Sequence, residues 1–227
     1  AVKGLESLPG CMLGWKDMTW STVRTAGDDF PGTMFHCSAV TSDRKLCVVG
    51  GGDGRKPRND VYCLETRGEF RWKRAASSGQ HPPACVGHQC AVVAQRLFVF
   101  GGWVQDPDKT KQYKNDLYVS SPPLCSPSTV GPQLVRPQQH FSYRYCLNTT
   151  SFKWVLTTPS GVAPKGRINH TMVSTSSDHI ILFGGVGMPS SSGSQSFNDL
   201  HILQPTSMTW SHVATPASSP QGRRQHS

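Results

Sequence analysis

Four tryptophans recur along the chain, and each is followed by a histidine sixteen residues later. The pairs are Trp20 and His36, Trp72 and His88, Trp154 and His170, and Trp210 and His226. A spacing that recurs in this way indicates internal repeats, and a period of about 50 residues is typical of proteins built from stacked structural units. The chain is therefore expected to fold as a series of like units.

Each of the first three histidines leads into an apolar run that ends in two glycines. The glycine pairs are Gly50-Gly51, Gly101-Gly102 and Gly184-Gly185. A polar loop follows each pair. An Asn-Asp sequence comes next and is followed by Val or Leu and one further residue, at 59–62, 115–118 and 198–201. None of the glycine pairs has the spacing of a phosphate-binding loop that opens a helix, so we interpret them as strand exits that need positive φ angles.

Each unit is expected to form four short strands. One follows the histidine, one precedes the glycine pair, one carries the Asn-Asp sequence and one carries the tryptophan. The second strand is almost continuously apolar, as expected of a strand that is covered on both faces. A four-stranded sheet cannot cover both its faces alone, whereas sheets that stack around an axis cover one another. The sequence therefore predicts an all-β fold.

The repeat positions divide the chain into segments. The predicted divisions are the end of a preceding blade over 1–22, complete repeats over 23–74, 75–155 and 156–212, and the start of a further, truncated repeat over 213–227. The tryptophan-to-tryptophan distance is 82 residues in the middle unit, against 52 and 56 in its neighbours. We interpret the excess, at about 120–141, as a Ser/Pro-rich loop insertion.

The glycine pair after an apolar strand, the downstream Tyr62 or Tyr118 and the tryptophan beyond them resemble the kelch motif. The resemblance covers the chain from about Trp20 to Ser227. It implies a kelch-type β-propeller arc of four-stranded antiparallel blades, with about three complete blades and two partial flanking ones. The resemblance implies about six or seven blades in a closed ring, and the chain has three glycine pairs, so we interpret it as a fragment of a longer propeller or as a partial gene product.

Composition and spacing argue against several kinds of site. No stretch approaches the roughly 20 apolar residues that a membrane span needs, so no membrane contact is expected. The net charge of +9 raises the question of nucleic acid. The basic residues stand in short loop clusters without the aromatic-basic signature of a known module, so nucleic-acid binding is not expected.

The residues that recur in every unit are interpreted as structural. The histidines are expected to be buried imidazoles hydrogen-bonded to the backbone rather than metal ligands, so neither a metal nor a cofactor is expected. Asp60, Asp116 and Asp199 are expected to accept backbone hydrogen bonds at turns. Cysteines inside apolar runs, such as Cys47 and Cys90, are interpreted as reduced thiols. They favour an intracellular location, which we take as cytoplasmic with a nuclear or other intracellular location as the alternative. Two glycosylation sequons, at 148–150 and 169–171, argue against it.

Function is expected in the loops that differ between units, because the blades hold those loops rigidly. In kelch proteins the loops between the second and third strands and the loops between blades lie on one face and commonly bind the partner. On this resemblance the candidate partner-binding residues are Arg55, Arg58, Trp103, Lys111, Tyr113, Lys165, Arg167, Arg223 and Arg224. Their charge predicts an acidic peptide or loop of another protein as the partner, and solvated loop charges are the alternative.

The leading prediction is a non-catalytic protein–protein interaction module. The resemblance suggests substrate recognition or scaffolding, for example in ubiquitin-ligase, cytoskeletal or trafficking complexes. The alternative is a metal-dependent kelch-propeller enzyme of the galactose-oxidase or specifier-protein type, because a few kelch propellers are catalytic. Stoichiometric copper or iron in the purified protein would decide for the enzyme.

Overall fold

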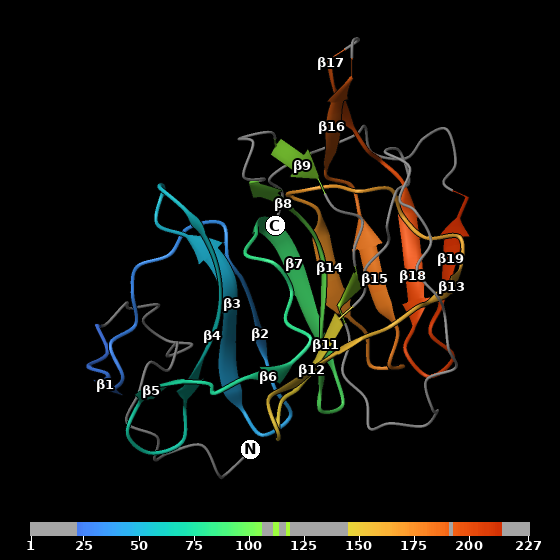
Figure 1. The fold of residues 1–227 in the computed structure, drawn as a ribbon. Coiled ribbons are helices and arrows are strands. Elements are labelled where there is room, and N and C mark those ends of the chain that lie inside the picture. The colour runs from blue at the N-terminus through green and yellow to red at the C-terminus, as the bar shows by residue number, and fades with distance from the viewer. Residues whose placement is uncertain (1–21, 106–110, 114–116, 119–144, 191–192, 215–227) are drawn as a thin grey trace, which may run out of the picture.

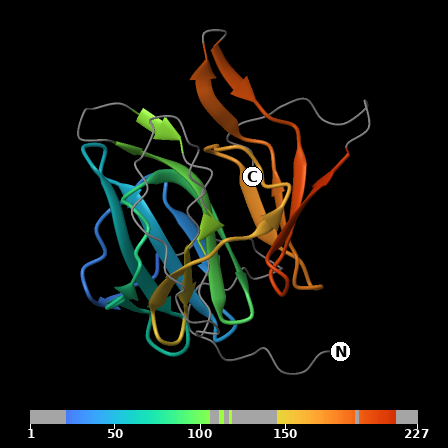
Figure 2. The same cartoon turned by 45° about the vertical axis from the view of Figure 1, so that its right-hand side comes forward.

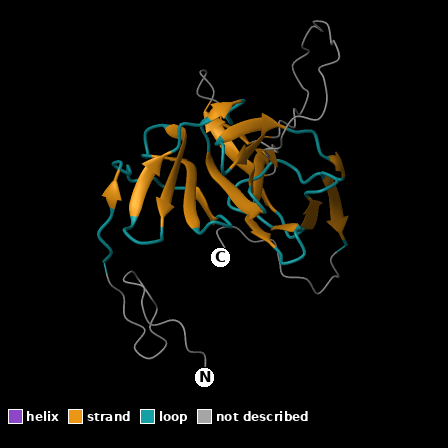
Figure 3. Cartoon of the chain, turned by 90° about the horizontal axis from the view of Figure 1, so that it is seen from below, coloured by secondary structure: helices purple, strands orange, loops and turns teal. Residues whose placement is uncertain are grey.

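Three like sheets stand side by side in the order of the sequence, and they fan out along an arc (Figures 1 and 3). The computed structural model describes residues 22–105, 111–113, 117–118, 145–190 and 193–214. Every regular element within these ranges is a strand, and none of them is a helix. The predicted all-β, kelch-type architecture is confirmed.

The first sheet, blade 1, has the strand order β1-β5-β4-β3-β2. Its strands are β1 (Ala26–Gly27), β2 (Cys37–Val40), β3 (Lys45–Gly52), β4 (Pro57–Glu65) and β5 (Arg71–Arg74). The four longer strands are antiparallel and occupy the four predicted positions, whereas β1 pairs with β5 in parallel. The parallel strand was not predicted, because a two-residue strand carries no periodic signal.

The second sheet, blade 2, has a third strand that consists of separate segments. Its strands are β6 (Ser78–Gly79), β7 (Val86–Val93), β8 (Arg96–Gln105), β9 (Lys111–Tyr113), β10 (Leu117–Tyr118), β11 (Tyr145–Asn148) and β12 (Lys153–Leu156). Both β10 and β11 pair with β8, at its middle and at its beginning. The predicted insertion at about 120–141 lies outside the described residues, between these two segments.

The third sheet, blade 3, repeats the pattern and adds a hairpin after its glycine pair. The blade consists of β13 (Ser160–Gly161), β14 (Thr171–Ser174), β15 (Ile180–Phe183), β18 (Leu200–Gln204) and β19 (Thr209–Val213). The hairpin is formed by β16 (Val186–Ser190) and β17 (Gly193–Ser196) and extends beyond the sheet (Figure 2).

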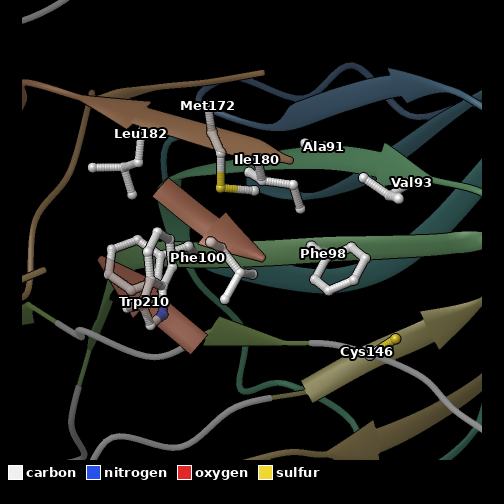
Figure 4. Packing of buried hydrophobic residues seen from close by; sticks show 10 residues of the cluster. Ala91, Val93, Phe98, Phe100, Cys146, Met172, Ile180, Leu182 and Trp210 are labelled. Atoms are coloured by element: carbon white, nitrogen blue, oxygen red, sulfur yellow. The ribbon is translucent and has the colours of Figure 1, made fainter. Parts of the chain in front are cut away.

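The core of the protein lies between the blades. Between blades 1 and 2 the buried cluster consists of Cys37, Cys47, Val49, Val61, Cys63, Cys90, Leu97, Val99, Leu147 and Trp154. Between blades 2 and 3 it consists of Ala91, Val93, Phe98, Phe100, Cys146, Met172, Ile180, Leu182, Leu203 and Trp210 (Figure 4). Alternate residues of β8 belong to alternate clusters, because successive side chains of a strand point to opposite faces. This explains why the second strand is apolar throughout.

The repeated tryptophan covers the face that looks toward the preceding blade. Trp154 of blade 2 is 1% exposed and Trp210 of blade 3 is 2% exposed. Trp72 of blade 1 is only half-buried, and it stacks on Phe30 with 4.2 Å between the ring centroids. The described part of the chain places no sheet against this face of blade 1, whereas Trp154 and Trp210 each meet a neighbouring blade.

The histidine joins its own blade to the preceding one. In blade 2 the Nε2 atom of His88 lies 2.9 Å from the carbonyl oxygen of Val49 in blade 1. A carbonyl only accepts, so Nε2 carries the hydrogen, and Nδ1 faces the Cys85 thiol at 3.4 Å. Gly50 makes room for this ring, since a Cβ there would stand 2.8 Å from His88 Cε1, and its φ of 61° also favours glycine.

The prediction of buried histidines holds for two of the described positions. His88 is buried and bonded to the backbone as expected, and His170 is buried with its ring edge-on to Phe100. The prediction is wrong for His36, which is exposed and whose Nδ1 lies 3.1 Å from the nearby Thr33 carbonyl. Since the buried imidazoles pack on the preceding blade, His36 has no such surface within the described residues. Trp20 and His226 lie outside them.

Backbone hydrogen bonds also cross each joint between blades. The residue before the histidine donates to its counterpart in the preceding blade, from Gly87 to Phe35 at 2.9 Å and from Asn169 to Gly87 at 3.0 Å. The second glycine of the first two pairs donates to the following blade, from Gly51 to Cys85 at 3.2 Å and from Gly102 to Arg167 at 3.0 Å. Each such bond contributes about 1 kcal/mol, so backbone hydrogen bonds stabilise the contacts between blades as well as the sheets themselves.

Two of the cysteines differ from the prediction of reduced thiols. Cys47 and Cys63 are directly opposite one another on β3 and β4 and form a disulfide, with Cα atoms 4.2 Å apart. The free cysteines among the described residues are Cys37, Cys85, Cys90 and Cys146, and all are buried. Because disulfides are rare in cytosolic proteins, the cysteines no longer support the cytoplasmic location inferred from the sequence.

Replacing Trp154 with alanine should lower the free energy of unfolding by about 3–5 kcal/mol, because it empties a fully buried site between blades 1 and 2. The matched change Trp72→Ala should cost roughly half as much, because that side chain is only half-buried. Urea denaturation followed by circular dichroism measures both. Equal losses would contradict the assignment of the core to the joints between blades.

The stability of the fold should depend on the pH through His88. Burial lowers the pKa of this histidine from its ordinary value of 6.5 to about 4. Between pH 6.5 and pH 4 the unfolded chain binds a proton at this histidine and the folded chain does not. The free energy of unfolding should therefore fall by about 3 kcal/mol from pH 6.5 to pH 4. His88→Gln keeps a donor for Val49 and does not titrate, so it should flatten this slope in urea denaturation. An unchanged slope would show that His88 is not its source.

Candidate functional site: the loop end of the blades

The loops predicted to bind a partner gather at one end of the sheets. This end contains the turn between β3 and β4, the β9 segment and the β16–β17 hairpin (upper part of Figure 1). The loops between blades meet them there, since Arg58 pairs with Cys85 and Ile168 pairs with Val186 in isolated bridges. The structure thus brings the two predicted loop classes together.

The turn between β3 and β4 is held by Asp53. Its carboxylate accepts the backbone N–H groups of Arg55 at 2.9 Å and Lys56 at 3.0 Å, and it forms an ion pair with Arg58 at 3.1 Å. The two backbone hydrogen bonds, followed by the one from Arg58, hold the pKa of Asp53 well below its usual range. Arg58 is therefore engaged within the loop, whereas the side chains of Arg55 and Lys56 are exposed.

Blade 2 and the loop that follows it contain further predicted binding residues. Trp103 is half-buried in β8, opposite Val86 and Tyr113 in the strand register. Lys111 and Tyr113 are the end residues of β9, whose backbone pairs with the end of β8. Lys165 is exposed in the loop between blades 2 and 3. Arg223 and Arg224 lie outside the described residues.

The prediction that Arg167 belongs to an exposed binding surface is wrong. Its side chain is 0% exposed and forms a bidentate pair with Asp199, with N···O distances of 2.6 and 2.8 Å. It also donates to the carbonyls of Gly184 at 2.8 Å and Lys165 at 3.0 Å, and its guanidinium lies 4.1 Å from the Phe197 ring centroid. Arg167 is therefore a buried residue that connects the loop between blades 2 and 3 to the sheet of blade 3.

The repeated aspartates also differ from their predicted role as turn caps. Burial would raise the pKa of Asp199, but the hydrogen bonds from Arg167 and His201 outweigh it and hold this pKa well below its usual range. Asp60, at the same repeat position in blade 1, accepts hydrogen bonds from Arg74 instead. Both carboxylates therefore receive guanidinium groups rather than the predicted backbone N–H groups. Asp116 lies outside the described residues.

Two exposed apolar residues at this end were not predicted. Met34 is 49% exposed and Phe35 is 54% exposed. Met34 forms two backbone hydrogen bonds with Gly52, which places it beside the turn of Arg55 and Lys56. No sequence signal marks the two residues, because they precede a repeated histidine without a repeated pattern of their own.

The residues that the structure describes form neither a metal site nor a membrane-spanning helix. Among the residues it describes, no group of three or more His, Cys, Asp or Glu side chains could hold a metal ion. Within the same ranges, no helix is long and apolar enough to cross a membrane.

Removing the guanidinium of Arg167 should destabilise the fold rather than a complex. Arg167→Met should lower the free energy of unfolding by about 3 kcal/mol at pH 7, because it leaves the carboxylate of Asp199 without its buried partner. The loss should shrink as the pH falls below about 4, the ordinary range of an Asp carboxyl, because Asp199 of the variant then takes up a proton whereas that of the unchanged chain stays ionised. Arg74→Met removes the exposed pair with Asp60 and should cost about 1 kcal/mol or less. Equal losses of unfolding free energy in the two variants, measured by urea denaturation, would contradict a structural role for the buried Arg167–Asp199 pair.

Several known proteins are similar to this chain. Kelch domain-containing protein 2 of Bos taurus is 30% identical over 210 residues, which cover 73% of this chain and 52% of that protein. Rho GTPase-activating protein gacHH of Dictyostelium discoideum is 25% identical over 206 residues, 89% of this chain and 11% of that protein. Host cell factor of Drosophila melanogaster is 28% identical over 212 residues, 88% and 12% respectively. The chain thus spans about half or less of the length of these relatives.

A solved structure and a family model also match the chain. The solved structure of YjhT matches with a TM-score of 0.56 at 16% identity, over 82% of this chain and 52% of its own, which shows a likeness of fold alone. The family model described as the KLHDC2/KLHL20/DRC7 Kelch-repeats domain matches residues 10–129 and 131–227. With its glycine pairs, joint histidines and inward tryptophans in place, the chain belongs to this kelch-repeat family.

Proposed function

We propose that the chain is a non-catalytic module that binds another protein through the loop end of its blades. The observation that carries the proposal is the turn of blade 1, where Asp53 fixes the backbone and leaves the side chains of Arg55 and Lys56 exposed. Rigid loops bind with a smaller loss of conformational entropy than mobile ones. The half-buried Trp103 and the exposed Lys165 at the same end add an aromatic and a further cation.

The charge of this end favours an acidic partner. Within the turn 53–58, Asp53 pairs with Arg58, and no ion pair to Arg55 or Lys56 is present among the described side chains. Two exposed cations would attract carboxylates of a peptide or loop and steer its approach, and salt would weaken the effect. Substrate recognition or scaffolding is the role that this binding would serve. Kelch-repeat relatives such as Kelch domain-containing protein 2 and host cell factor support a binding module.

Reversing the charge at Arg55 should weaken partner binding without changing the fold. In affinity capture from a cell extract, Arg55→Glu should lose the partners that the unchanged chain retains, and added salt should release the same proteins. Arg67→Glu is the matched control, because Arg67 is exposed in the turn at the opposite end of β4. If Arg55→Glu and Arg67→Glu both retained every partner, the loop end would not be the binding surface.

A further inference from the structure

Phe35 has a backbone conformation that bulky residues rarely adopt. Its φ is 57°, in the left-handed region that disfavours a large side chain. Gly87 and Asn169 occupy the same repeat position in blades 2 and 3 with φ of 73° and 52°. Glycine and asparagine tolerate this region, so blade 1 has the least suitable residue of the three.

Burial does not compensate for the strain at Phe35. Phe152 and Met208 also have positive φ, 49° and 51°, but both side chains pack against the clusters between blades. Phe35 is instead 54% exposed. Strained residues that the surrounding structure holds in place cluster at functional sites, and a large apolar side chain presented to solvent is a suitable contact for a partner.

Phe35 lies at the joint between blades 1 and 2, and the structure describes both of these blades. At Gly87, a Cβ would stand 3.2 Å from the Cβ of Ile168, so side chains at this repeat position point toward the following blade. For Phe35 the following blade is blade 2, whose Gly87 donates to the Phe35 carbonyl at 2.9 Å. The side chain is therefore left exposed with that neighbour present.

The surroundings of Phe35 are rigid and positively charged. The backbone of Met34 is bonded to Gly52 at 2.8 and 3.0 Å, which fixes Met34 beside the end of β3 that leads into the turn of Arg55 and Lys56, and the carbonyl of the adjacent Phe35 accepts from Gly87 at 2.9 Å. The Met34 methyl carbon would lie 3.7 Å from a Cβ at Gly54, in the middle of that turn. Apolar contacts and exposed cations thus stand side by side.

We propose that Met34 and Phe35 form an apolar anchor point for a partner segment in which one apolar side chain is flanked by carboxylates. The apolar side chain covers Phe35 and Met34, and the carboxylates meet Arg55 and Lys56. This inference rests on the proposed function and adds to it the composition of the bound segment. It also assigns the strain at Phe35 to binding, so that relief of the strain should stabilise the chain and weaken the complex.

Synthetic peptides test the anchor directly. The probes are fluorescent peptides in which four Asp or Glu residues flank one central position, occupied by Leu, Phe, Ser or Gly, and their binding is followed by fluorescence anisotropy. The Leu and Phe peptides should bind about tenfold or more tightly than the Ser and Gly peptides, because only they cover the apolar pair. Phe35→Asn should remove this preference and raise the melting temperature, since asparagine tolerates the left-handed conformation.

The control is Val40→Asn, which changes an apolar residue that is 62% exposed at the opposite end of β2. It should keep the preference for the Leu and Phe peptides. Equal binding of the Leu and Ser peptides, or an unchanged preference in Phe35→Asn, would overturn the anchor. A dimer that dissociates on Phe35→Asn, measured by light scattering, would also overturn it by showing that a second copy covers the site.

The two proposals fail separately in this experiment. If Arg55→Glu abolished binding of all four peptides while Phe35→Asn left the apolar preference intact, the basic surface would stand and the anchor would fall. If no acidic peptide bound the unchanged chain, the acidic partner class and the anchor would both be overturned.

Discussion

A blade with apolar side chains on both faces is stable only when neighbouring blades cover them. In β8 alternate residues belong to the two clusters on either side of blade 2, so one strand contributes to both joints. The bond from His88 to the Val49 carbonyl and the space above Gly50 then fix how the blades meet. The repeated sequence pattern follows from this arrangement, because every unit must present one face to each neighbour.

Because the joints hold the blades together, the residues at the loop end can differ between family members. Asp53 stabilises its turn through backbone hydrogen bonds, and Arg167 stabilises the following loop from within. Two arginines that the sequence predicts as binding residues therefore have opposite roles, since Arg55 is exposed and Arg167 is buried. Binding surfaces built on such loops can change from one family member to another without changing the joints.

The sequence predicted the elements that carry a period and missed those that do not. The four strands, the glycine pairs and the buried His88 follow from repetition, because each recurs with its neighbours. The burial of Arg167 could not be predicted, since a cation in a polar loop has the same local pattern whether it faces solvent or Asp199. The exposed Phe35 gave no signal either, because its strain depends on a φ angle that the sequence does not show.

Native-state hydrogen exchange at the amides of Gly87 and Asn169 tests most directly whether the joints hold the arc together. These amides donate across the two joints to Phe35 and Gly87. If the joints open only when the blades unfold, both amides should exchange as slowly as that of Val99 within β8. Exchange as fast as that of Arg55 in the exposed turn would show that the blades are loosely tethered and would contradict the account.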